Sequence, residues 1–503
     1  MLLPVPIAAR RGVLRQLFTP SLVDVFFCAL LCVAFVRPMG IQALLVDGDT
    51  GWHIRTGELV LTSGHAPRVD GFSFTRAGQP WFAWEWLADT VFALFFQWCG
   101  IAGVAVLAGV VLSLAAAALL ARLLGRGCGL WIALAATMAA VSASSIHYLA
   151  RPHVFYILFY TLALWVVETD RRRPSALLWT LVPLTILWTN LHAGFTAWLA
   201  TLALLVAVCA FERDWGAARR YGALAAMSAA ATLLSPYGWN LHRHIAGYLG
   251  ASWILDHVQE FQSPSIRSEG AIVFAVLLLG AVALAARAGR FESALVLLWG
   301  FAALRSARHI PFFAIAAAPV VADAAARWWR RKASRQPAGA TARVLWELAG
   351  DLGRSRRASL WLPLGASAAF IVVPLAGPAG FPAFRFPVEA VERNAAHLTP
   401  AASMPRVLTS DQWADYLIFR LYPRQRVFFD GRSDFYGPAL GADYRKLFAA
   451  HASWRELLDR YAFDLALLPY DWPLSTMLAN EPGWRRVYHD SVAVLYVRQE
   501  GGS

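Results

Sequence analysis

The chain has 503 residues, of which 58% are hydrophobic and 15% charged, and its formal net charge is +13. A soluble protein has about 25% charged residues, so this composition excludes an ordinary soluble protein over most of the chain. Hydrophobic runs of about 18 or more residues recur through roughly the first three quarters, which indicates a polytopic membrane protein. The positive charge does not indicate nucleic-acid binding, because the basic residues lie mostly between the hydrophobic runs, where they set topology.

The hydrophobic runs predict eleven membrane spans followed by a soluble domain. We expect the spans at about 21–45, 101–123, 129–147, 153–169, 176–191, 194–211, 219–235, 270–287, 291–307, 310–326 and 359–377. The predicted fold class is therefore an α-helical polytopic membrane protein with a small extracytoplasmic α/β domain. The predicted boundary divides a transmembrane domain, 1–378, from a soluble domain, 379–503.

Basic residues predict the orientation of these spans. Arg10, Arg11 and Arg15 precede the first run, and with a cytoplasmic N-terminus about 22 Lys and Arg residues fall inside, against about eight in the outside loops. The rule that positive residues stay inside then agrees with an odd number of spans. We expect a multi-pass protein of the cytoplasmic membrane whose C-terminal domain lies outside the cytoplasm.

The predicted topology places many polar residues at the outer ends of the spans. Polar side chains at membrane depth are costly, and by default they mark a function. Any one of them alone is better explained as a loop or snorkelling residue, but their recurrence at alternate span ends predicts a polar cavity in the outer leaflet. The residues are Asp47, Asp49, His53, Glu85, Asp89, His147, Arg151, His153, Asn190, His192, Arg305, Arg308 and His309.

The first outer loop, 46–100, is too long for a simple connection. It opens with VDGDTGWH at 46–53, and its second half, 81–100, is hydrophobic with interleaved tryptophans. Such aromatic-rich helices lie in the membrane interface. Glu85 and Asp89 are four residues apart, so they share one face of this helix.

Several motifs carry a resemblance to a known superfamily. An acid pair follows the first span, a TSG turn and a proline come next, and then a W...EWL motif; NLHAGF, SPYGW and FFDGRSDFYG occur further along. This pattern resembles the GT-C superfamily of polytopic glycosyltransferases, which includes aminoarabinose transferases, protein mannosyltransferases and oligosaccharyltransferases. The sequence is most similar to bacterial membrane proteins grouped with the rhizobial lipopolysaccharide glycosyltransferases.

The resemblance implies an enzyme that moves a sugar from a polyprenyl-phosphate carrier to a lipid, glycan or protein acceptor at the outer membrane face. In aminoarabinose transferases an essential acid precedes the turn glycine by about fifteen positions, and counting back from Gly64 gives Asp49. Thr50 and His53 depart from the pattern of that family. Asp49 is therefore the candidate base, and a single displacement would invert the anomeric centre.

The remaining outer residues are candidates for binding donor or acceptor. Guanidinium groups bind phosphate bidentately, and a carboxylate can hold a sugar hydroxyl. Arg305 and Arg308 are three residues apart, close to His309 at a predicted outer helix end, so we expect their guanidinium groups to converge. Donor- and acceptor-binding candidates are Asp47, His53, Glu85, Arg151, His153, His192, Arg305, Arg308 and His309. Asp47, Asp49 and His53 also have the chemistry to bind a divalent cation, and the sequence leaves that cofactor open. In a simpler alternative, Asp47 and Asp49 only cap a helix.

The C-terminal part alternates expected strands and helices, which predicts a small α/β domain. The strands are expected at 406–410, 426–431, 463–470, 485–490 and 492–498. Asp430, Arg432 and Asp434 follow the second of these, where acids are more often turn formers than catalysts. The competing function is a lipid or polysaccharide transporter or scaffold without catalysis, which should show internal repeats and interrupted helices.

Overall fold

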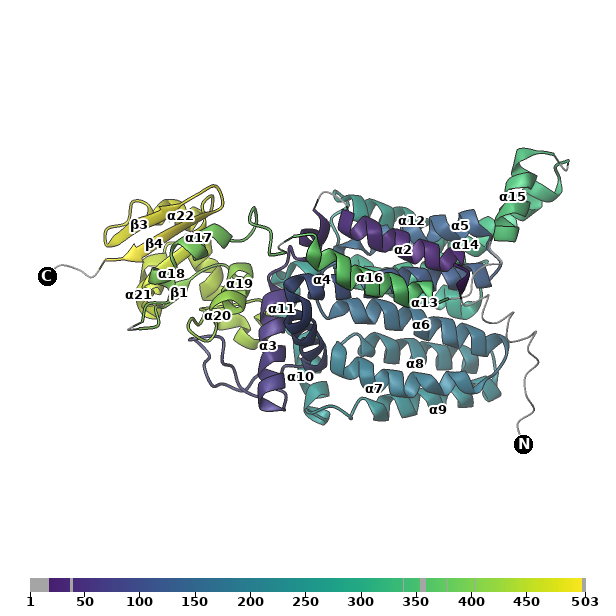
Figure 1. The fold of residues 1–503 in the computed structure, drawn as a ribbon. Coiled ribbons are helices and arrows are strands. Elements are labelled where there is room, and N and C mark those ends of the chain that lie inside the picture. Colours follow the sequence, from purple (N-terminus) through teal and green to yellow (C-terminus); the bar gives the residue numbers. More distant parts are fainter. Residues whose placement is uncertain are drawn as a thin grey trace, which may run out of the picture.

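The computed structural model describes a bundle of long helices with a small α/β unit at one end (Figure 1). The described residues are 18–36, 39–337, 339–352, 359–377, 379–401 and 403–499. Arg10, Arg11 and Arg15, on which part of the predicted orientation rests, lie outside them.

Each of the eleven expected spans coincides with a helix. Two of them, α4 and the segment Ala307–Ser334, are long and apolar enough to cross a membrane by length and composition, among the residues described. The count of eleven spans therefore stays a prediction. The helices are α2 (Leu22–Val36), α4 (Trp86–Gly125), α5 (Leu130–Ala143), α6 (His153–Arg172), α7 (Leu181–Leu191, preceded by η3, Ala176–Thr180), α8 (Phe195–Phe211), α9 (Trp215–Ala231), α12 (Glu269–Ala285), α13 (Arg290–Arg305), α14 (Ile310–Ser334) and α16 (Trp361–Leu375).

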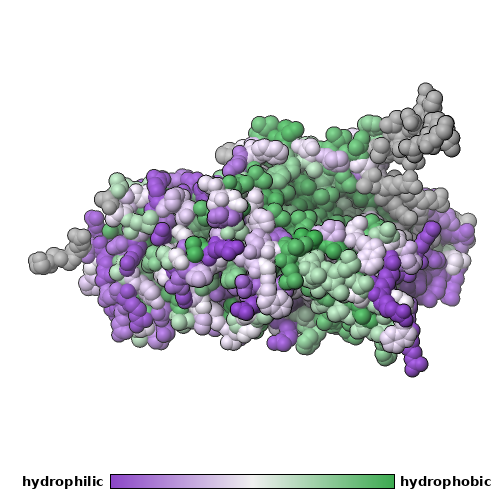
Figure 2. Space-filling view, turned by 90° about the horizontal axis from the view of Figure 1, so that it is seen from below, coloured by the Kyte–Doolittle hydropathy of each residue, from purple (hydrophilic) through white to green (hydrophobic). Residues whose placement is uncertain are grey.

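The outside of this bundle is hydrophobic. Val276 and Leu279 on α12, Phe301 on α13, and Ile371 and Val372 on α16 are all more than 60% exposed. Figure 2 shows hydrophobic side chains over the middle of the bundle and hydrophilic ones toward both ends. A water-soluble protein rarely exposes such a surface, whereas a bundle embedded in lipid is expected to.

The first outer loop folds into two helices that cross the end of the bundle. After η1 (Gly40–Leu44), α3 (Asp49–Ser63) ends at Gly64, which has φ of 75°, a left-handed value that favours glycine. α4 contains a break with non-helical φ and ψ at Cys99 and Gly100. This break coincides with the predicted change from an interfacial helix, 81–100, to a span.

Short outer segments complete that end of the bundle. They are η2 (Ser145–His147), α10 (Trp239–Leu249), α11 (Ser252–His257), η4 (Gln259–Phe261) and η5 (Ala307–His309). The last two are tied together, because Ala307 N–H donates to the Gln262 carbonyl at 2.9 Å and the Ser306 hydroxyl to the Glu260 carbonyl at 3.1 Å. At the opposite end, α15 (Thr341–Leu352) projects from the bundle (Figure 1).

The C-terminal part contains a four-stranded sheet in the order β1-β2-β4-β3. β1 pairs parallel with β2, whereas β4 pairs antiparallel with both β2 and β3. The elements are α17 (Val388–Arg393), α18 (Ala395–Leu398), β1 (Val407–Leu408), α19 (Asp411–Leu421), α20 (Ser433–Phe448), α21 (Trp454–Tyr461), β2 (Leu465–Pro469), α22 (Pro473–Leu478), β3 (Trp484–His489) and β4 (Ala493–Arg498).

The strand expected at 426–431 is wrong. Only Val427 forms bridges there, one to Val407 and one to Ser73 in the first outer loop. The apolar residues that suggested a strand are buried because the segment runs between β1 and that loop, and the Phe74 N–H donates to the Val427 carbonyl at 3.0 Å. The C-terminal elements and the first outer loop are therefore joined through the backbone.

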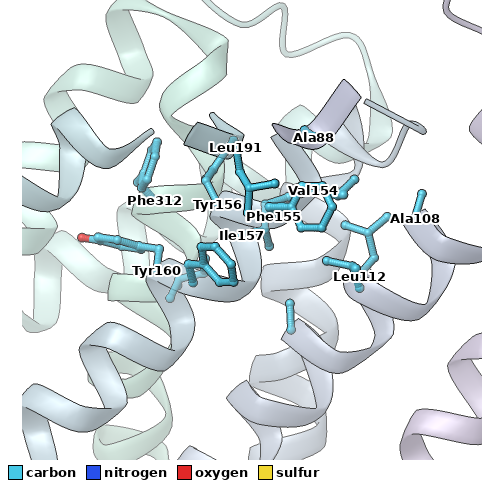
Figure 3. Packing of buried hydrophobic residues seen from close by; sticks show 14 of the residues in the cluster. Ala88, Ala108, Leu112, Val154, Phe155, Tyr156, Ile157, Tyr160, Leu191 and Phe312 are labelled. Atoms are coloured by element: carbon cyan, nitrogen blue, oxygen red, sulfur yellow. The ribbon is translucent and has the colours of Figure 1, made fainter. Parts of the chain in front are cut away.

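Aromatic packing fills the bundle beneath this end. In Figure 3, Tyr156 and Tyr160 of α6 lie beside Phe312 of α14. The Tyr156 and Phe312 rings are stacked, with centroids 4.6 Å apart, and Tyr160 meets Phe312 edge-on at 4.9 Å. Such contacts hold α6 and α14 in a fixed relation, so residues at their outer ends have fixed positions.

The fold leads to a test of orientation. We expect the α/β end of the bundle to lie outside the cytoplasm, because the predicted inside loops are rich in arginine. A reporter fused at Ser503 should then be active only when it is one that works in the periplasm. Activity of a cytoplasm-specific reporter at that position would contradict the orientation. As a control, a reporter inserted within 211–214, in a loop predicted to be cytoplasmic, should be active only when it is one that works in the cytoplasm.

Candidate functional site

One cavity of 150 Å³ lies between the bundle and the α/β unit. Eight of the ten predicted site residues line it, although they come from segments up to about 260 residues apart in sequence. These eight are Asp49, His53, Glu85, Arg151, His153, His192, Arg308 and His309. The span ends that carry these residues therefore converge in space at one end of the bundle.

Asp47 and Asp49 have different positions at the start of α3. The Asp47 Oδ1 accepts the Asp49 N–H at 3.0 Å, so Asp47 caps the first turn. Asp49 is the first residue of the helix, and its side chain is buried and lines the cavity. The capping alternative thus describes Asp47, and Asp49 remains available for chemistry.

Arg151 joins both acids. Its guanidinium lies 3.1 Å from the Asp47 Oδ2, 2.7 Å from the Asp49 Oδ2 and 3.9 Å from the Glu260 Oε2. It stands just before α6, in a loop that is fixed to η1 by the Ala150 N–H, which donates to the Leu44 carbonyl at 2.7 Å. One cation therefore balances carboxylates from two outer loops.

Burial raises the pKa of Asp49 to about 7, although Arg151 opposes the shift and the neighbouring charge of Asp47 adds to it. A carboxyl group near that value is partly ionised at neutral pH and can accept a proton. Its Oδ1 makes no hydrogen bond that satisfies it. The Asp415 carboxyl lies close to this oxygen, and its hydrogen bond with Asp49 opposes the rise in the Asp49 pKa.

The α/β unit closes the cavity over Asp49. A Cβ on Gly431 would lie 2.2 Å from the Asp49 Oδ1 and 2.8 Å from the Asp415 Oδ2, so a larger residue at that position would force the two carboxyl groups to move. Asp415, on α19, is fully buried, and its Oδ1 accepts the Gly431 N–H at 3.0 Å. Burial raises the pKa of Asp415 well above its usual value, and the nearby Asp49 charge adds to this.

A row of polar side chains runs along the other wall. The His53 Nδ1 lies 2.6 Å from the Asp89 Oδ1, and its Nε2 lies 3.7 Å from the Glu85 Oε2. The His192 Nε2 lies 3.4 Å from the other Glu85 oxygen. Glu85 and Asp89 thus point to one side, as their spacing predicted, and both face His53. Burial raises the pKa of Glu85 to about 8, so this group is largely neutral at pH 7.

Arg308 lies on the far side of the cavity. Its guanidinium is 4.1 Å from the centre of the Phe261 ring and 4.0 Å from the Glu260 Oε1. Glu260 therefore stands between Arg308 and Arg151. Burial alone would raise the pKa of Glu260, but the two arginines outweigh it and hold the pKa at about 2.

The expected convergence of Arg305 with Arg308 is wrong. Arg305 is the last residue of α13 and is exposed, and it does not line the cavity. The backbone of Ser306 is extended, with φ of −152° and ψ of 120°, so the two arginines are not on one continuous helix. The helical spacing of three that suggested convergence does not apply across this break.

The other predicted histidines have partners of their own. The His153 Nε2 is 2.6 Å from the His147 carbonyl oxygen, and the His192 Nδ1 accepts the Gly194 N–H at 2.8 Å. The His309 ring stacks on Trp299 with centroids 6.0 Å apart. These contacts fix the rings at the cavity wall.

A divalent cation does not fit the set Asp47, Asp49 and His53. The Arg151 guanidinium already occupies the space between the two acids, and the His53 Nδ1 faces Asp89. Over the described residues, no group of three or more His, Cys, Asp or Glu side chains gathers in a way that could hold a metal ion. The positive charge beside Asp49 is supplied by arginine.

Sequence reasoning missed three residues of the site: Glu260, Asp415 and Arg432. Arg432 lies 2.6 Å from the Asp430 Oδ2 and 2.8 Å from the Asp70 Oδ1, and all three side chains are buried. The FFDGRSDFYG motif, interpreted as a turn, therefore connects the α/β unit to the first outer loop. The motif could have identified Arg432 as a site residue. Glu260 lies in a polar loop that contains no motif, so no signal in the sequence pointed to it.

Comparison with solved structures shows that a protein of known structure has a similar fold. The structure is similar to the archaeal oligosaccharyltransferase AglB from Archaeoglobus fulgidus in complex with an inhibitory peptide and a dolichol-phosphate. The TM-score is 0.51 and the sequence identity 12%, and the match covers 95% of this chain and 74% of that one. The chain shares this fold.

No family model matches the sequence, and no curated protein matches it. AglB is an oligosaccharyltransferase, so the shared fold agrees with the resemblance to polytopic glycosyltransferases drawn from the motifs. It does not distinguish the bacterial subgroup, which stays a prediction. At 12% identity the comparison concerns the fold alone, and chemistry has to be argued from the cavity.

Proposed function

We propose that the protein is a membrane glycosyltransferase of the GT-C type, which moves a sugar from a polyprenyl-phosphate carrier to a hydroxyl-bearing acceptor. The observation that carries the proposal is one cavity that brings a buried carboxylate, Asp49, together with two guanidinium groups, those of Arg151 and Arg308. It lies at the end of a bundle with a hydrophobic exterior and an oligosaccharyltransferase-like fold.

The chemistry needs a proton acceptor and a place for a departing phosphate. In the proposed reaction Asp49 takes the proton of the acceptor hydroxyl as its oxygen attacks the anomeric carbon of the donor. The bond between that carbon and the phosphate oxygen breaks, and the carrier leaves as polyprenyl phosphate. A single displacement of this kind inverts the anomeric centre.

Arg308 and Arg151 are suited to the phosphate. They flank Glu260 at 4.0 and 3.9 Å, so an anion already lies between the two cations. A phosphate has the same kind of charge and can accept from both guanidinium groups. We propose that the donor phosphate takes up this position and that Glu260 moves aside when it binds.

Glu85 and the histidines are suited to the sugar. A carboxyl group with a pKa of about 8 can donate a hydrogen bond at neutral pH as well as accept one. His192 and His53 flank it and lie within 4 Å of its oxygens. Lipid, glycan and protein acceptors all carry groups that this wall can bind, so the proposal covers all three.

The competing transporter or scaffold has less support. A secondary transporter binds its substrate near the middle of the membrane, between repeats. This cavity lies at the end of the bundle and is closed by Gly431 of the α/β unit, over a carboxylate with a raised pKa. A raised pKa in a cleft is typical of catalytic groups.

Arg308→Ala tests the phosphate position, and Arg305→Ala, three residues earlier in the chain, provides a matched control. Because Arg308 lines the cavity and Arg305 does not, only the first change should weaken binding of polyprenyl phosphate, by roughly tenfold or more. Binding to the purified protein in detergent measures this. Equal affinities for the two variants would remove Arg308 from the proposed site, provided that both melt like the wild type.

Asp49→Asn tests the base. Asparagine keeps nearly the same shape but cannot take a proton, so transfer should fall by roughly a hundredfold or more while donor binding persists. Asp47→Asn should have a smaller effect, because Asp47 does not line the cavity: its Oδ1 accepts a backbone N–H and its Oδ2 faces Arg151. The assay measures transfer to a hydroxyl acceptor in proteoliposomes. Wild-type turnover in Asp49→Asn would show that this carboxylate is not the base.

The raised pKa of Asp49 predicts a pH profile. The base must be ionised to accept a proton, so the rate should rise with pH and be half-maximal near pH 7, where the folded pKa lies. Initial rates of transfer between pH 5 and pH 9 measure this limb. A rate that does not change from pH 5 to pH 7 would indicate that burial does not raise the pKa of the carboxylate that acts as the base.

A further inference from the structure

A second polar cavity lies at the other end of the bundle, away from Asp49 and the α/β unit. Its volume is 370 Å³. It is lined by the C-terminal end of α4, by α6, α13 and α14, and by the turn between α12 and α13. The charged residues in its wall are Arg126, Arg171, Arg172, Arg287 and Arg327, together with Glu168, Glu292 and Asp323.

The carboxylates of this cavity are all engaged. Glu168 lies 2.8 Å from Arg126 and 2.6 Å from Arg172, Asp323 lies 2.5 Å from Arg126, and Glu292 lies 2.6 Å from Arg171. Five guanidinium groups thus face three carboxylates, which leaves an excess of two positive charges.

The two remaining arginines are Arg287, in the turn before α13, and Arg327, on α14. Neither has an ion-pair partner among the described parts of the chain, and both side chains are exposed at the rim. The turn itself ends at Gly289, and the α13 helix of 16 residues begins at Arg290 without a side-chain cap. Its free N–H groups add positive potential to the same wall.

The deeper wall is rigid. Arg126 bridges Glu168 of α6 and Asp323 of α14, and the Arg122 Nε donates to Glu168 at 2.8 Å from a buried position. These pairs fix three helices relative to one another. The cationic rim is therefore presented by a fixed frame, which lowers the entropic cost of binding an anion.

Aromatic side chains place the cavity at the level of lipid headgroups. Trp328 follows Arg327 directly and is 58% exposed, and Phe211 and Trp215, at the neighbouring end of α8 and start of α9, are 77% and 58% exposed. Exposed tryptophans gather where the hydrocarbon ends and water begins. An anion that reaches this rim from the membrane would carry its charge on a headgroup phosphate.

We infer that this cavity binds the phosphate of an anionic phospholipid in the leaflet opposite the proposed catalytic cavity, through Arg287 and Arg327. Guanidinium groups bind phosphate oxygens in pairs, and basic pockets between helices are suited to lipid headgroups. The inference does not rest on the proposed transferase activity, because the two cavities share no residue.

The test compares two pairs of substitutions in the full chain. Arg287→Gln/Arg327→Gln removes the two rim charges. Arg219→Gln/Arg335→Gln removes the same charge from exposed positions that do not line the cavity, and serves as the control. Both proteins are purified in detergent, checked for an unchanged melting temperature, and titrated with dioleoylphosphatidylglycerol while native mass spectrometry counts bound lipids.

The rim variant should bind phosphatidylglycerol roughly thirtyfold more weakly than the wild type, with the control within about twofold. Dioleoylphosphatidylcholine should bind the wild type no better than the rim variant. Equal loss in the two variants, or equal binding of the two lipids by the wild type, would overturn the inference. Displacement of phosphatidylglycerol by millimolar inorganic phosphate would also overturn it, because the ligand would then be a free phosphate.

Discussion

The ion cluster around Arg151 is the constraint on which the outer end of the molecule depends. A guanidinium and three carboxylates, those of Asp47, Asp49 and Glu260, meet where the chain leaves the bundle. Removing one partner of a buried pair costs about 3–5 kcal/mol, because the other charge is left uncompensated. Arg151 therefore holds the first outer loop and the η4 loop together, and it determines how much of the Asp49 charge is stabilised.

Close backbone approach determines how the α/β unit becomes part of the cavity. A Cβ on Gly51 of α3 would lie 2.6 Å from the Asp415 carbonyl oxygen, and one on Gly57 would lie 1.9 Å from the Asp89 carbonyl oxygen. The two glycines let α19 and α4 pack closely against two different faces of α3. Because α3 begins at Asp49, this packing brings Asp415 and Gly431 over the same carboxylate that Arg151 engages from the bundle.

The positions of the helices were predictable from the sequence, and so was the clustering of most site residues. Long hydrophobic runs specify helices locally, and the alternation of basic loops sorts the remaining polar residues to one end. Arg305 was misplaced because a helical spacing was extended across Ser306, where the backbone is extended. Glu260 and Asp415 could not have been found, because a single acid in a polar loop or on an amphipathic helix shows no pattern before tertiary contacts form.

The wrong prediction of a strand at 426–431 also arose because the sequence does not reveal tertiary partners. Its hydrophobic residues do become buried, but their partners belong to the first outer loop, some 350 residues earlier in the chain, as the bond from Thr75 to the Phe428 carbonyl shows. Periodicity measures burial and does not identify what causes it. Asp430 and Arg432 were likewise typical of a turn, yet both are buried and paired.

In the proposed function, the two acids Glu85 and Glu260 would let one cavity serve both an anionic donor and a neutral sugar. Burial acts on both, but Glu260 lies between two guanidinium groups and keeps its charge, with a pKa of about 2. Glu85 faces imidazoles instead, and its pKa rises to about 8. At neutral pH the negative charge is thus concentrated on the arginine side, where a donor phosphate would replace it. The opposite wall stays nearly neutral and rich in hydrogen-bonding groups, so binding of a phosphate-linked sugar would require the displacement of only one carboxylate, that of Glu260.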